Sequence, residues 1–142
     1  MSFDEKRTWV YVVVTPIIYL IYTALLFVRA GGGPVAEVSY GGLLFGAIGA
    51  VIIATILGTI ASVIAARGEV DENDERDAAI NRHGELRGYT TFSLGILGVL
   101  ALTVAEVDHF WIGNAIFLDY VVASQVSSVV KLTAYRSGLP AW

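Results

Sequence analysis

Long apolar runs separated by short polar stretches are the main pattern of this chain. The runs cover residues 9–28, 42–65, 89–105 and 110–134. Each is close to the roughly 20 residues that an α-helix needs to cross a bilayer, and none alternates in the manner of a barrel strand. Because backbone polar groups in lipid must be paired within their own segment, the pattern predicts an all-α, integral membrane four-helix bundle with one sizeable loop, residues 66–88.

Composition agrees with a membrane protein and removes several kinds of chemistry. The 142 residues are 56% hydrophobic and 15% charged, whereas soluble domains are about 25% charged. The net charge of -4 is modest, and no basic block suggests a nucleic-acid partner. Without cysteine there is no disulfide, thiolate metal site or cysteine nucleophile. We expect a single transmembrane domain over residues 1–142, in contact with the lipid bilayer and without a cofactor.

The basic residues predict how the spans are oriented. Eight of them lie beside the runs or near their ends, on the side of the N-terminus, the central loop and the C-terminus, namely Lys6, Arg7, Arg67, Arg76, Arg82, Arg87, Lys131 and Arg136. Only Arg29 lies on the other side. Since short cytoplasmic loops are enriched in Lys and Arg, we expect both termini in the cytoplasm and the chain in the cell (cytoplasmic) membrane.

A cleaved signal peptide is the alternative interpretation of the first run. Residues 28–31 resemble a small-residue cleavage site. However, the run is longer than a normal signal core and is interrupted by Pro16, and Asp4 and Glu5 cancel the charges of Lys6 and Arg7. We therefore expect the first helix to be retained.

Small residues recur at every fourth position of the second span. They are Gly42, Gly46, Ala50, Ala54, Gly58 and Ser62. Small side chains let helices approach closely in lipid, so the stripe predicts helix packing. Because it turns by about 200° along the helix, it should contact two neighbours, which makes the second span central. Both neighbours would be helices of the same bundle, or one of them would belong to a second copy of the protein in a homo-oligomer. The alternative is that the stripe forms a groove for a ligand.

Asp119 is an acid within the fourth span, about 14 Å from its outer end. Such a carboxylate costs about 2.5 to 3.5 kcal/mol on insertion scales, so it should face the bundle interior. Tyr19 and Tyr22 reach the same depth on the first span, and we expect their hydroxyls to be its partners. The acid either locks the bundle, or takes up a proton or cation with Asn114 and Gln125 as further stations.

The charged loop predicts a helix with acids first and arginines later, which matches the helix dipole. Asn73 or Asp74 would cap its start. Here the sequence resembles an uncharacterised family of small prokaryotic four-helix membrane proteins, whose mark is Asp-Glu-Arg-Asp, then any two residues, then Ile. The matching residues are Asp74, Glu75, Arg76, Asp77 and Ile80. The resemblance implies the arrangement of the spans and of this segment but no known activity. By analogy only, it suggests a sensory or regulatory role.

No catalytic or metal motif is present in the sequence. His83 and His109 fall on opposite sides of the predicted membrane, and the acidic run is not an EF-hand because Arg76 stands in place of its glycine. We therefore predict no enzyme, but a membrane scaffold or regulatory protein that presents its charged helix to a cytoplasmic protein partner. The alternative is a small oligomeric proton- or cation-coupled transporter that uses Asp119.

Overall fold

The computed structural model describes residues 3–65 and 75–139. Within these ranges the chain forms four α-helices and one short 3-10 helix and has no strand. The elements are α1 (Phe3–Ala30), η1 (Val35–Glu37), α2 (Gly41–Ala65), α3 (Glu75–Val104) and α4 (His109–Ser137). Each of the α-helices is long and apolar enough to cross a membrane. The predicted all-α class with four candidate spans is therefore confirmed.

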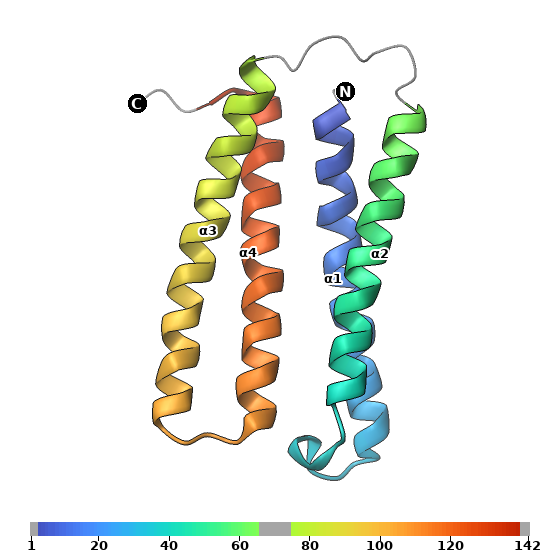
Figure 1. The fold of residues 1–142 in the computed structure, drawn as a ribbon, viewed down its shortest axis with the longest axis vertical. Helices are drawn as coiled ribbons and strands as arrows, with labels where there is room; N and C mark the ends of the chain where they lie inside the picture. The colour runs from blue at the N-terminus through green and yellow to red at the C-terminus, as the bar shows by residue number, and fades with distance from the viewer. Residues whose placement is uncertain (1–2, 66–74, 140–142) are drawn as a thin grey trace.

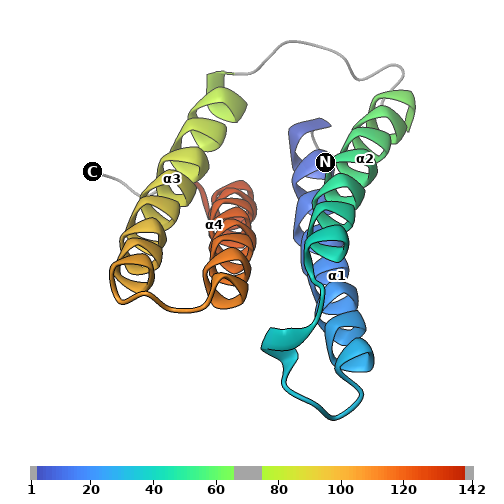
Figure 2. The same ribbon diagram turned by 60° about the horizontal axis from the view of Figure 1, so that its bottom comes forward.

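Two helical hairpins lie side by side in the order α3, α4, α1, α2 (Figure 1). Figure 2 shows the same two pairs from another direction. The main contacts join α3 to α4, α4 to α1 and α1 to α2. Helices α1 and α4 are thus the inner pair and α2 lies at an edge, so the second span does not have two main neighbours within this bundle. A second copy as its other neighbour stays a prediction. Below, the terminal end is the end where α1 starts and α4 stops, and the hairpin end is the opposite one.

Helix α3 begins earlier than the apolar pattern indicates. It starts at Glu75 and continues without a break to Val104, so residues 75–88 of the predicted loop are helical. Glu75 and Asp77 lie in its first turn, where the helix dipole favours negative charge. Gly84 and Gly88 do not break the helix, because both are buried against α4. The predicted capping residues Asn73 and Asp74 lie outside the described residues.

The hairpin end is closed by turns and aromatic contacts. Gly31 and Gly32 have φ of 55° and 88°, a backbone conformation that glycine adopts without strain. Asp108 caps α4 by accepting a hydrogen bond of 2.8 Å from the Phe110 amide. Tyr40 donates to the His109 carbonyl at 3.0 Å, which ties the start of α2 to the start of α4. These contacts fix the two hairpins relative to each other at this end.

Candidate functional site

Asp119 is buried between α4 and α3, with 9% of its surface exposed. Its carboxylate lies against Gly95, where a Cβ atom would overlap it. The Oδ2 atom is buried and has no hydrogen-bond partner among the described residues. Gly95 therefore provides the space that the carboxylate occupies, a role that the sequence analysis did not assign to it.

The two tyrosines predicted to bind Asp119 contact other residues of α4 instead. The Tyr22 hydroxyl donates to Oδ1 of Asn114 at 2.7 Å, and the Tyr19 ring packs edge-on against Phe117 with 5.5 Å between centroids. Asn114 and Asp119 are five residues apart, which separates them by about 140° around α4. Helix α1 packs on the Asn114 face and α3 on the Asp119 face. The structure therefore does not bring Asp119 together with the two tyrosines through the expected hydrogen bonds.

Further polar contacts follow the α1–α4 interface toward the terminal end. Gln125 donates to the Tyr11 carbonyl at 3.4 Å, in the helical turn that precedes Pro16. A proline disturbs the hydrogen bonding of the turn before it, so an acceptor there suits a side-chain donor. The Thr15 hydroxyl is buried without a hydrogen-bond partner in the described ranges. The inner pair of helices is thus polar at intervals along its length.

A polar cavity of about 230 Å³ opens where α1, α3 and α4 meet near the terminal end. Its lining consists of Arg7, Thr8, Tyr11, Glu85, Ser124, Ser127, Ser128 and Lys131. This cavity is not among the features predicted from the sequence, where Lys131 indicates only the orientation of the chain. A usable signal exists in the sequence, because Ser127, Ser128 and Lys131 follow Ser124 by three, four and seven residues and so share one face of α4.

The small-residue stripe of α2 is divided between two environments. Gly58 contacts Val10 of α1, and Ser62 is buried and donates to the Gly58 carbonyl at 2.8 Å. Ala54 is half-buried. Gly42, Gly46 and Ala50 instead line an apolar groove of about 260 Å³ between α1 and α2, and no atom lies within 4 Å of a Cβ placed on Gly42 or Gly46. Close helix packing therefore uses only the part of the stripe nearer the terminal end.

The Asp-Glu-Arg-Asp-x-x-Ile segment is docked onto the bundle by one face. Ile80 is fully buried, at 0% exposure. Arg76 donates to the Tyr135 carbonyl of α4 at 3.3 Å, and Asn81 donates to Asp4 of α1 at 2.7 Å. Glu75 and Arg76 are exposed and Asp77 is half-buried, while Asp74 lies outside the described residues. This terminal half of α3 is therefore held by both inner helices.

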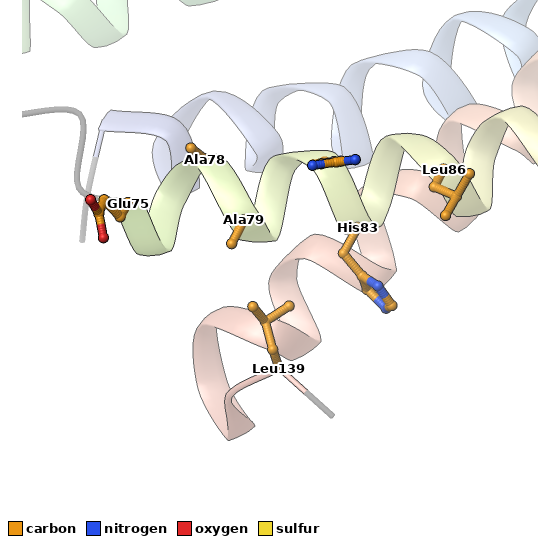
Figure 3. Close-up of a pocket in the computed structure, with 7 residues that line it drawn as sticks. Glu75, Ala78, Ala79, His83, Leu86 and Leu139 are labelled. Atoms are coloured by element: carbon orange, nitrogen blue, oxygen red, sulfur yellow. The ribbon is translucent and has the colours of Figure 1, made fainter. Parts of the chain in front are cut away.

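The opposite face of the same segment borders a groove of about 530 Å³ (Figure 3). Its lining comprises Glu75, Ala78, Ala79, Arg82, His83 and Leu86 of α3 together with Leu139. Figure 3 shows Ala79 and His83 on the side of α3 nearest Leu139. Small and apolar side chains thus line a groove that also carries an acid and an arginine. We call this surface the α3 groove.

Neither a metal site among the described residues nor a similar known protein assigns a function to this chain. Across residues 3–65 and 75–139, no group of three or more His, Asp or Glu side chains is placed to hold a metal ion. The resemblance to the four-helix family stays a prediction. In comparisons with known proteins, no family model, curated protein or solved structure matches the chain.

Proposed function

We propose that this chain is a non-enzymatic scaffold or regulatory protein of the cell membrane that presents the terminal half of α3 to a protein partner. One observation carries the proposal: the same helical segment has one face anchored by the fully buried Ile80 and another face that exposes Arg82. A surface that is already ordered loses little conformational entropy when a partner binds. The biased distribution of basic residues supports placing both ends of the chain, and hence this surface, in the cytoplasm.

The α3 groove suggests the chemistry of the partner. Ala78 and Ala79 leave room for large apolar side chains, and Leu86 and Leu139 add apolar surface beside them. Arg82 is exposed at the groove and can pair with a carboxylate. An amphipathic helix with apolar residues on one face and an acid beside them has these properties. We therefore propose an acidic amphipathic helix of a cytoplasmic protein as the occupant.

Photocrosslinking from the α3 groove tests this proposal. A photoreactive amino acid at position 79 should give one discrete adduct in intact cells, because Ala79 is exposed in the groove. Arg82→Glu should abolish that adduct, since it places a negative charge against the acidic partner. Arg87→Glu makes the same charge change at an exposed position of the same helix outside the groove lining, and should leave the adduct intact.

Two results would count against the partner helix. One is an adduct that persists in Arg82→Glu, and the other is equal loss in both charge-reversal variants. Position 76 is less informative than position 82, because Arg76 also holds the Tyr135 carbonyl and a substitution there changes the contact between α3 and α4.

A second candidate function is a proton- or cation-coupled carrier, in which several copies together form the path. One observation favours it: Oδ2 of Asp119 is buried in the middle of an apolar helix and lacks a hydrogen-bond partner among the described residues. An intramembrane acid without a partner is costly and is typical of ion and proton pathways.

Flux measurements in liposomes distinguish this candidate from the scaffold. If Asp119 carries the proton or cation, Asp119→Asn should abolish uptake of protons, Na⁺ or K⁺ by vesicles that contain the protein. Glu106→Gln is the matched control, because it removes an exposed acid at the hairpin end. Absence of flux from the unmodified protein, or equal flux in Asp119→Asn, would exclude the carrier.

A further inference from the structure

Lys131 is the one buried basic side chain in the described residues, with 9% of its surface exposed. Its ion pair with Glu85 is long, at 3.4 Å from Nζ to Oε1. Charge-assisted hydrogen bonds of this kind are normally about 2.7 to 2.9 Å. The Glu85 side chain is 68% exposed, so much of its charge is screened by solvent. A buried ammonium group with so weak a partner is poorly compensated.

Gly84 of α3 determines where the Lys131 side chain lies. A Cβ atom on Gly84 would overlap Cγ of Lys131 and lie 2.8 Å from its Cε. The aliphatic part of Lys131 is therefore packed directly on the bare backbone of α3. Because this contact fixes the side chain, the ammonium group is held in the polar cavity between α1, α3 and α4.

The rest of the cavity lining supplies hydrogen-bond donors. Within the described part of the chain, the hydroxyls of Ser124, Ser127 and Ser128 are in no hydrogen bond. Arg7 adds a second basic group to the lining beside the acid Glu85, and its own ion pair with Asp4 is long, at 3.9 Å. Hydroxyl, ammonium and guanidinium donors that line one cavity are suited to an anion.

We infer that this cavity binds the phosphate group of a phosphoester or of inorganic phosphate, with Lys131 as the charged ligand and the three serines as hydrogen-bond donors. Inorganic phosphate offers four oxygens to these donors, and a phosphodiester offers two anionic and two weaker ester oxygens, whereas a carboxylate offers two. Lys131 lies six residues before the end of α4 at Ser137, about 9 Å along the helix axis. This depth allows two sources of phosphate: a phospholipid headgroup, or a soluble ion entering from the terminal end.

Binding to the full-length protein in a zwitterionic detergent tests the inference and separates the two sources. One arm titrates inorganic phosphate, and the other titrates dioleoylphosphatidylglycerol into mixed micelles with dioleoylphosphatidylcholine as the reference lipid. Lys131→Met keeps an unbranched side chain on Gly84 but removes the charge, and should weaken binding at least about tenfold. Arg87→Gln removes one positive charge from an exposed position and should change affinity by less than about twofold.

Each outcome bears on the inference. Lysine-dependent binding of phosphatidylglycerol alone assigns the cavity to a lipid headgroup, and lysine-dependent binding of inorganic phosphate assigns it to a soluble ion. Binding of neither probe, or equal binding by Lys131→Met, would overturn the inference. If Lys131→Met loses its helical circular dichroism, Ser124→Leu is the variant that decides. This substitution narrows the cavity without removing a charge. A tenfold loss of affinity for the probe supports the site, and unchanged affinity refutes it. Partner capture by the α3 groove is not needed for any of these results.

Discussion

Replacing Gly84 with leucine is expected to separate α3 from α4 at the terminal end and to lower the free energy of unfolding by about 3 kcal/mol or more. A Cβ at this position would lie 2.9 Å from the Ser127 carbonyl oxygen and would also overlap the Lys131 side chain. The carbonyl belongs to the helix backbone, so it cannot move aside as a flexible side chain would. In lipid, close backbone approach replaces the hydrophobic drive between helices, and a large side chain removes it.

Gly98→Leu is the matched control for this substitution. Gly98 is on the same helix and is exposed, and a Cβ placed on it would have no atom within 4 Å. Since glycine is a poor helix former, leucine at this site should leave stability unchanged or raise it by up to about 1 kcal/mol. Unfolding by sodium dodecyl sulfate in mixed micelles measures both variants. Equal free energies for Gly84→Leu and Gly98→Leu would show that the α3–α4 interface is not packed through Gly84.

Ile80→Ala is expected to have the second largest effect, a loss of about 2 to 5 kcal/mol. Ile80 is fully buried, so truncation removes its packing contacts and leaves a cavity beneath the terminal half of α3. Leu86→Ala truncates a side chain that is 59% exposed on the same segment, and should change stability by less than about 0.5 kcal/mol.

Hydrogen exchange localises the effect of Ile80→Ala. Amides of residues 75–88 should exchange faster in this variant, because Ile80 anchors that part of the helix, while α1 and α2 keep their protection. Unchanged exchange in residues 75–88, together with similar losses in Ile80→Ala and Leu86→Ala, would mean that the segment is not held by Ile80.

The length of each apolar run was sufficient to predict the helices, because hydrocarbon thickness sets that length. It was not sufficient to predict the start of α3, which the order of charges in the loop predicts instead, as a helix capped by Asn73 or Asp74. Neither pattern predicts that the residues from Glu75 to Arg87 form one unbroken helix with the third span. Their helix is stabilised by tertiary contacts at Ile80, Gly84 and Gly88. The contacts of Gly84 and Gly88 are with α4, which begins more than twenty residues later in the sequence.

Neighbour relationships were harder to predict than the helices themselves. In lipid, the packed face and the lipid-exposed face of a helix are both apolar, so hydrophobic periodicity does not distinguish them. The burial of Asp119 followed from the cost of a charge in hydrocarbon, but its environment depended on which helix covers that face. In the structure Gly95 of α3 lies against the Asp119 carboxylate, and the Tyr22 hydroxyl donates its hydrogen bond to Asn114. Depth alone therefore selected the wrong partners.

The contact between α1 and α4 also has a consequence for biosynthesis. Each hairpin joins neighbours in the chain and can form as soon as its second helix is made, but the contact between the hairpins must wait for α4. Until then Tyr22 lacks Asn114, and the Tyr11 carbonyl lacks Gln125. A nascent chain stalled before α4 would therefore lack these polar contacts as well as the packing between the two hairpins.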